Sequence, residues 1–227
     1  MTLTDAELAV MCDKSSRDSA LVKLYRENTY LDAYAKHTGL RVARDPHQAI
    51  GGLWEDYGAL QRDFLIAEGL QPDHRFLDLG CGTGRLARKL APYLGAGHYT
   101  GVDISEDAIA HAVYLSEVEG WAAQQPQFVI SLTAGVDGPF DMIWAFSVFN
   151  HLPPEHVYFL IERVGQLLTT GRFLFSYVPT PHAVRTGLKQ FKHPWTFFQD
   201  CSVKAGLLLT EVTTWPGLQR VACVRRL

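Results

Sequence analysis

Apolar residues change their spacing along the chain near residue 75, which divides it into two kinds of predicted structure. Before that point they recur at helical spacing over 21–34 and over 53–68, and Gly69 is placed to end the second helix. The segment DPHQAIGG (45–52) interrupts the two patterns. Near the N-terminus, Thr4 and Glu7 have the spacing of a capping box, which predicts one more helix.

After residue 75, short apolar runs alternate with helical patterns. Such alternation predicts an α/β domain whose mostly parallel sheet is covered on both faces by helices. The final two runs, 207–215 and 218–226, have the pattern of a closing hairpin. The other predicted strands are 75–79, 98–103, 127–132, 140–146 and 172–178, and the predicted helices are 85–94, 105–119, 153–168 and 194–206.

Composition excludes several classes of partner. The 227 residues carry a formal net charge of −3, which gives no general attraction to nucleic acid or to anionic lipid. The basic clusters at 41–44 and 220–227 are short, and we expect both to be solvated edges. No apolar run approaches the length of a membrane span. We therefore expect neither a nucleic acid nor a membrane partner.

The cysteines and the N-terminal residues indicate the compartment. Cys12, Cys81, Cys201 and Cys223 form no CxxC pair, and acidic residues stand where a secretory signal would need an apolar core. This pattern is typical of free thiols in a reducing compartment, so we expect a cytoplasmic location.

Three glycines in FLDLGCGTGRL (76–86) follow a predicted strand and open a predicted helix. In that position Gly80, Gly82 and Gly84 would leave backbone N–H groups bare toward the crevice where ligands of open α/β sheets bind. Asp103 ends the next strand, where an acid can accept both hydroxyl protons of a ribose. The glycines could instead form only a tight turn, and Asp103 only a helix cap. Their combination favours a nucleoside site.

The spacing also indicates which nucleoside. A dinucleotide-binding loop would need a third glycine at position 85, but Arg85 stands there and the glycine comes one residue earlier. The acid Asp78 precedes the turn, and an acid facing the crevice would repel a pyrophosphate and attract a cationic ligand. S-adenosylmethionine fits this demand, because it carries an ammonium and a sulfonium and no phosphate.

Four segments resemble, in order, the motifs of the class I S-adenosylmethionine-dependent methyltransferases: 76–90, 99–105, 140–152 and 171–178. The resemblance implies a Rossmann-like methyltransferase fold, with a mostly parallel seven-stranded sheet, helices on both faces and a C-terminal antiparallel hairpin. Residues 1–52 would form a helical N-terminal extension or lid, and 53–227 the S-adenosylmethionine-binding methyltransferase domain. Residues 49–82 also resemble a bacterial subgroup associated with saccharide and small-molecule modification.

The same resemblance implies positions for the cofactor. The methionine part would lie against the glycine turn with Asp78 near its ammonium, Asp103 would hold the ribose hydroxyls, and Ile104 would pack on adenine. The family often has an acid after the third strand, whereas this chain has Ser131, Leu132 and Thr133, so a backbone acceptor or Thr133 would bind the adenine amino group. The expected cofactor-binding residues are Asp78, Gly80, Cys81, Gly82, Gly84, Asp103, Ile104, Leu132, Thr133, Ala145 and Phe146.

Methyl transfer needs alignment of the acceptor and, for a hydroxyl acceptor, a base. His151, after the fourth strand, has an ordinary pKa suited to that work, although a histidine at a helix start can simply bond local backbone. His193 is a second candidate on the segment after the fifth strand. The expected substrate-binding residues are Trp54, Tyr57, Ser147, Asn150, Tyr177 and Trp195, of which Trp54 and Tyr57 could cover the cofactor or simply pack in the core.

No metal is expected, because Asp141 stands at the start of the fourth strand and no acid stands at its outer end. The sequence therefore predicts a metal-independent methyltransferase that acts on a small molecule, by O-methylation of a sugar or secondary metabolite. N-methylation, a nicotinamide-dependent oxidoreductase and a non-catalytic cofactor-binding protein stay open as alternatives. The sequence specifies neither the acceptor nor the oligomeric state.

Overall fold

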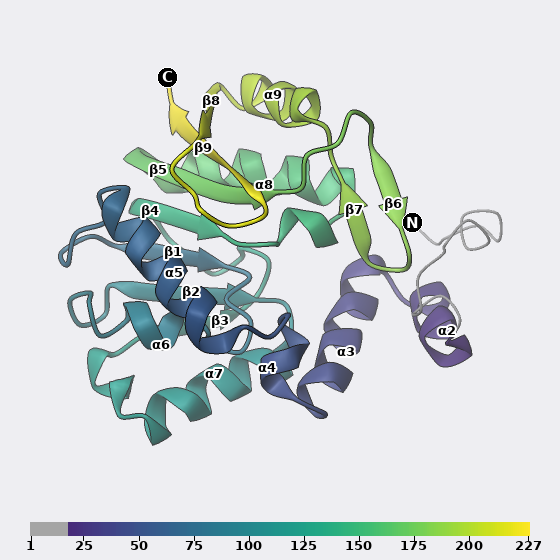
Figure 1. Ribbon diagram of the computed structural model, residues 1–227, viewed down its shortest axis with the longest axis horizontal. Coiled ribbons are helices and arrows are strands. Elements are labelled where there is room, and N and C mark those ends of the chain that lie inside the picture. The colour runs from purple at the N-terminus through teal and green to yellow at the C-terminus, as the bar shows by residue number, and fades with distance from the viewer. Residues whose placement is uncertain (1–17) are drawn as a thin grey trace.

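The computed structural model describes residues 18–227, which are built around a seven-stranded sheet (Figure 1). Its strand order is β3-β2-β1-β4-β5-β9-β8. The first five strands in that order run parallel, and β9 and β8 are antiparallel at one edge. This confirms the predicted sheet and its C-terminal hairpin. The strands are β1 (Phe76–Leu79), β2 (Tyr99–Asp103), β3 (Gln127–Ile130), β4 (Phe140–Ala145), β5 (Leu168–Tyr177), β8 (Leu207–Val212) and β9 (Arg220–Arg226).

Helices cover both faces of the sheet because alternate strand residues point to opposite sides. Leu77 and Leu79 pack on the face covered by α8 (Pro154–Leu167) and α9 (Trp195–Lys204). Phe76 packs on the other face, with α5 (Trp54–Ala67) and α6 (Ala87–Leu90), and α7 (Glu106–Val118) lies beside them. The Ser105 hydroxyl caps α7 by accepting from the Ala108 N–H, so that helix begins where the sequence predicted.

The N-terminal extension contains three helices between residues 18 and 52, namely α2 (Ser19–Glu27), α3 (Tyr30–Val42) and α4 (Pro46–Ala49). The single helix predicted over 21–34 is wrong, because the chain breaks at Asn28 and Thr29. Asn28 is extended and donates from its side chain to the Leu24 carbonyl, while the Thr29 hydroxyl accepts from the Asp32 N–H and starts a new helix. The capping box at Thr4 and Glu7 lies outside the described residues.

Two further differences follow from short elements. The helix predicted over 85–94 is reduced to the single turn of α6, and a small hairpin of β6 (Val184–Thr186) and β7 (Gln190–Lys192) had not been predicted. Three-residue strands are too short to show a hydrophobic alternation. Two 3-10 turns, η2 (Trp121–Gln124) and η3 (Phe149–His151), complete the described elements.

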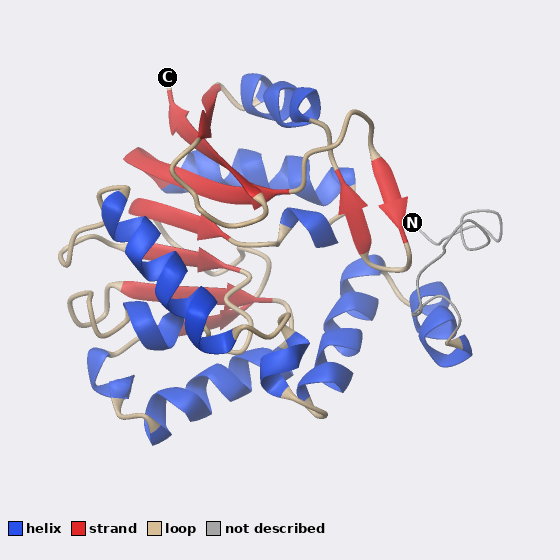
Figure 2. Ribbon diagram, viewed as in Figure 1, coloured by secondary structure: helices blue, strands red, loops and turns tan. Residues whose placement is uncertain are grey.

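The carboxyl ends of the parallel strands lie side by side. Leu79 of β1 pairs with Val102 of β2 on one side and with Ala145 of β4 on the other. The strand arrowheads point toward α3, α4 and the β6–β7 hairpin, which stand beyond that edge (Figure 2). Within residues 18–227, no helix has the length and apolar character needed to cross a bilayer.

Candidate active site

The glycine turn after β1 is fixed to the end of β2 by its backbone. The N–H groups of Gly80 and Cys81 donate to the Val102 carbonyl at 2.8 and 3.0 Å, and the Gly82 N–H donates to Oδ2 of Asp103 at 2.9 Å. Gly80 and Gly82 have φ values of +71° and +57°. Added Cβ atoms would stand 2.5 Å from Val148 and 2.7 Å from Ile50. Both conditions require glycine, so this turn presents bare backbone.

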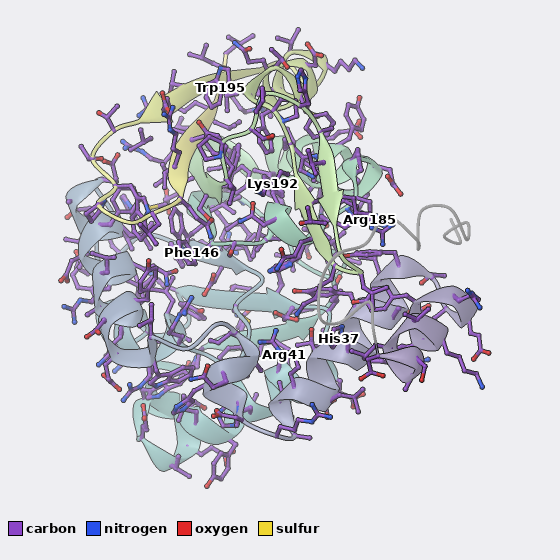
Figure 3. The ribbon with its side chains drawn as sticks, turned by 45° about the vertical axis from the view of Figure 1, so that its right-hand side comes forward. His37, Arg41, Phe146, Arg185, Lys192 and Trp195 are labelled. Atoms are coloured by element: carbon purple, nitrogen blue, oxygen red, sulfur yellow. The ribbon has the colours of Figure 1, made fainter. Side chains whose placement is uncertain are left out.

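A cavity of about 550 Å³ lies beyond this turn. It is walled by the ends of β1 and β2, the segment after β4, helix α3, the loop after α4, and the β6–β7 turn. Figure 3 shows His37 and Arg41 on α3 below the hairpin that carries Arg185 and Lys192, with Phe146 beyond the end of β4. Of the residues expected from the sequence, those lining the cavity are Asp78, Gly80, Cys81, Gly82, Asp103, Ile104, Leu132, Phe146, Ser147 and His151.

Other residues expected at the cofactor site do not line the cavity. Thr133 and Ala145 are buried, and Gly84 lies against Ala112 of α7, where its lack of a side chain allows close helix packing. The adenine amino group would therefore have to use Ser131 or Leu132, which do line the cavity.

The expected lid residues also stand back from the cavity. Trp54 stacks on the imidazole of His47, with ring centroids 4.0 Å apart. Tyr57 does not line the cavity, but it packs against two residues that do. Its ring lies 5.7 Å from that of Phe146 and 5.7 Å from the Arg85 guanidinium. Tyr57 thus supports the cavity wall from behind.

Four expected catalytic or substrate residues lie in packing positions instead. His193 is buried, its Nε2 donates to the Leu152 carbonyl, and its ring stacks on Phe197 at 4.8 Å. Tyr177 packs on Trp195 and donates to Glu211. Asn150 bonds Gln219, and both side chains donate to the Ser147 hydroxyl, which does line the cavity. Among these four, Asn150 is connected to the cavity through Ser147, and His193 is connected through the Leu152 carbonyl.

Asp78 and Arg85 are two buried groups of opposite charge in the cavity lining. The Asp78 carboxylate accepts a 2.6 Å hydrogen bond from the Tyr99 hydroxyl, and burial raises its pKa to about 7. Arg85 is 9% exposed, lies over the rings of Tyr57 and Phe146, and donates from Nη1 to the Gly52 carbonyl. Its Nε is buried without a partner in the described part of the chain. An orphaned donor at a cavity wall is suited to an anionic ligand group.

Asp103 presents a carboxylate that its own backbone surroundings hold in place. Oδ2 accepts from the Gly82 N–H and Oδ1 from the Ser105 N–H, each at 2.9 Å. Burial raises its pKa, while these bonds oppose the shift. Each carboxylate oxygen retains a second lone pair, so Asp103 can accept further hydrogen bonds from ligand hydroxyls.

His151 faces the cavity from η3 in a defined tautomer. Its Nδ1 lies 2.9 Å from the Lys189 carbonyl, which can only accept, so Nδ1 carries the hydrogen. The other ring nitrogen, Nε2, is then an unprotonated acceptor. Burial is the main cause that lowers the His151 pKa, to about 4, so the imidazole stays neutral at neutral pH.

Helix α3 supplies lining residues that the sequence did not indicate. Tyr34, His37, Thr38 and Arg41 recur every three or four residues, which places them on one face of the helix. Of the segment 41–44, which was expected to be a solvated edge, the half-buried Arg41 lines the cavity and Arg44 is exposed. The polar stripe on α3 was the available signal. Further unexpected lining residues are Ala49, Ile50, Gly51, Gln61, Leu79, Arg85, Leu86, Val102, Val148, Leu152, Leu160, Lys189 and Gln190.

Among residues 18–227, no group of three or more His, Cys, Asp or Glu side chains is arranged to hold a metal ion. The acids that line the cavity, Asp78 and Asp103, each accept hydrogen bonds from protein groups.

Comparison with known proteins gives a consistent result. Residues 77–174 match a family model described as a methyltransferase domain. The chain is 31% identical over 116 residues to the magnesium-protoporphyrin O-methyltransferase of Synechocystis sp., which is 51% of this chain and 49% of that protein. It is 35% identical over 100 residues to the sterol 24-C-methyltransferase ERG6B of Gibberella zeae, which is 42% of this chain and 26% of that protein.

The fold is similar to that of a solved relative. The crystal structure of magnesium protoporphyrin IX methyltransferase from Synechocystis with bound S-adenosylmethionine has a TM-score of 0.59 and 23% sequence identity, and the match covers 75% of this chain and 81% of that one. The chain spans about half the length of one curated relative and about a quarter of the other.

Proposed function

We propose that this chain contains a class I S-adenosylmethionine-dependent methyltransferase domain and that the protein methylates an oxygen atom of a small molecule, a sugar or a secondary metabolite. One observation carries the proposal. A single cavity brings together the bare glycine turn, the two acids Asp78 and Asp103, and the unprotonated Nε2 of His151. The activities of the relatives named above are not transferred, because the chain matches only part of each.

The residues of the cavity fit S-adenosylmethionine by their chemistry. The turn at Gly80 and Gly82 offers backbone that a Cβ would obstruct, and Asp103 offers oxygens for ribose hydroxyls. Asp78 would face the ammonium, and the orphaned Nε of Arg85 would face the carboxylate. When bound, the cofactor supplies an electrophilic methyl group and a thioether leaving group.

His151 is the residue we propose as the base. Lys189 fixes its Nδ1–H, so Nε2 can accept the proton of an acceptor hydroxyl as the oxygen is methylated. Its low pKa makes it a weak base, but it keeps Nε2 unprotonated at all pH values well above about 4. His193 is not proposed for catalysis, since it is not among the residues that line the cavity, and its Nε2 donates to the Leu152 carbonyl while its ring stacks on Phe197.

We propose that residues 1–52 act as a lid on the domain formed by 53–227. The support comes from α3 and the loop after α4, which contribute Tyr34, Arg41 and Ile50 to the cavity wall. Closing a site in this way excludes water from the reacting groups.

We also propose a cytoplasmic location. Its support is the state of Cys81, Cys201 and Cys223, which are buried and form no disulfide in the described part of the chain. Cys12 lies outside the described residues.

The test uses methyl-labelled S-adenosylmethionine with sugars and hydroxylated metabolites as acceptors. We expect transfer to a hydroxyl oxygen and a fall in turnover of roughly 10²–10⁴-fold for His151→Ala, with unchanged affinity for S-adenosylhomocysteine. His156→Ala is the matched control, since His156 is a half-buried histidine on α8 outside the cavity lining. Near-normal turnover of His151→Ala would show that His151 is not the base. Label on a nitrogen atom of the product would reassign the reaction to N-methylation.

A further inference from the structure

The wall of the cavity is divided by charge. The acids Asp78 and Asp103 stand at the ends of β1 and β2. The wall opposite them, built from α3 and the β6–β7 turn, contributes Arg41 and Lys189 and no acidic residue to the lining. The half with the acids also contains Arg85, so it suits a ligand group that carries both signs, whereas the half with Arg41 and Lys189 favours an anionic group.

The balance of charge in the cavity indicates which kind of ligand the wall built from α3 and the β6–β7 turn binds. The described lining side chains include three cations, Arg41, Arg85 and Lys189, against the two acids. S-adenosylmethionine carries an ammonium, a sulfonium and one carboxylate, so it adds a further net positive charge. A partly enclosed cavity with this excess of positive charge is electrostatically unfavourable until an anion enters it.

Arg41 and Lys189 lie close to the proposed base. Arg41 donates from Nη2 to the Gln48 carbonyl at 2.7 Å, which holds the guanidinium at the wall, and the Lys189 ammonium lies 5.9 Å from the centre of the Tyr34 ring. Tyr34 in turn lies against His151, with ring centroids 5.5 Å apart. The charges of Lys189 and Arg41 both add to the lowering of the His151 pKa, which indicates that they act at that ring.

We propose that the methyl acceptor is an anion, a small molecule with a carboxylate or phosphate group that Arg41 and Lys189 bind while its reacting atom lies at His151. The inference rests on the proposed function and adds the substrate class. Arg41 and Lys189 are positioned for binding and take no part in proton transfer.

A competing assignment gives Arg41 to the carboxylate of the cofactor. Arg85 meets that need better, because it is buried beside Asp78, the partner proposed for the cofactor ammonium, and has an unsatisfied Nε. The two assignments differ in which ligand loses affinity when Arg41 is changed.

The experiment separates a bacterial metabolite extract on an anion exchanger. The retained and unretained fractions are each incubated with the protein and S-adenosylmethionine that carries a deuterated methyl group, and labelled products are found by mass spectrometry. We expect label in the retained, anionic fraction. Label confined to the unretained fraction would overturn the inference while leaving the proposed function standing. Absence of label from both, in a protein that binds S-adenosylhomocysteine, would overturn the proposed function itself.

Variants then assign the residues. Arg41→Met and Lys189→Met should each lower kcat/KM for the labelled acceptor by about 10- to 100-fold, the loss expected for a hydrogen bond to a charged group. Their affinity for S-adenosylhomocysteine, measured by calorimetry, should stay unchanged. Arg44→Met and Lys192→Met are matched controls, since both cations lie on the same segments but outside the lining. If Arg41→Met instead lowers the affinity for S-adenosylhomocysteine, Arg41 binds the cofactor, and its proposed role in binding the acceptor is overturned.

Discussion

Asp78 is buried at the end of β1 with 4% of its surface exposed, and its charge state controls the electrostatics of the cofactor site. Burial disfavours its carboxylate form, and the hydrogen bond from Tyr99 and the charge of Arg85 offset that cost only in part. The resulting pKa of about 7 means that Asp78 gains its charge as pH rises through neutrality. Its attraction for an ammonium is therefore present above pH 7 and lost as pH falls through it.

This predicts pH-dependent cofactor binding. Affinity for S-adenosylhomocysteine should fall about tenfold between about pH 8 and about pH 6, since the ammonium of the ligand stays charged while Asp78 is protonated. Asp78→Asn should bind weakly and without this pH dependence. Methylthioadenosine, which lacks the ammonium, is the control for calorimetry. A parallel pH dependence for both ligands would assign the effect to another group.

Gly82 provides the second prediction at the residue scale. Gly82→Val should abolish binding of S-adenosylhomocysteine, because the new side chain would fill the turn and push against Ile50. Gly97→Val is the control, since Gly97 has φ +78° and nothing within 4 Å of an added Cβ. Both variants place valine in a left-handed backbone conformation, so each should lose about 1–2 kcal/mol in its free energy of unfolding, measured by thermal denaturation. Equal affinity of the two variants would mean that the glycine turn has only a structural role.

At the scale of elements, the sequence predicted the helices and strands that are long enough to show a hydrophobic pattern. The apolar strands β1, β2 and β4 and the cap of α7 at Ser105 appear where expected. The boundary between α2 and α3 was missed because it depends on local side-chain bonds at Asn28 and Thr29, which interrupt the backbone without interrupting the hydrophobic spacing.

Helix α3 should respond to the cofactor as an element. Its lining residues face the same cavity as the glycine turn, so ligand binding must stabilise both. At a concentration of S-adenosylhomocysteine about 100 times its Kd, the stabilisation is about 2.7 kcal/mol, and amide exchange over Tyr30–Val42 should slow by up to about 100-fold. Helix α9 lies outside the lining and is the internal control. Slowing at the glycine turn without slowing in α3 would contradict the proposed lid.

At the scale of the whole molecule, the sheet order brings the ends of β1, β2 and β4 together, and this part of the site could be predicted from motifs. The opposite wall could not. Arg41 and Lys189 are far apart in the sequence and meet at the cavity only because α3 and the β6–β7 turn pack around His151. No local pattern encodes such a contact, so the sequence indicated the cofactor but left the acceptor open.

The most direct test of this assembly is a calorimetric titration of S-adenosylhomocysteine into the wild-type chain and into Asp103→Ala. We expect the wild type to bind and the variant to lose about 1–3 kcal/mol, which is roughly 5- to 150-fold in Kd. Glu106→Ala, which removes an exposed acid three residues along the chain, should bind as the wild type does. A wild-type chain that does not bind, or a folded Asp103→Ala protein with unchanged affinity, would contradict the cofactor site.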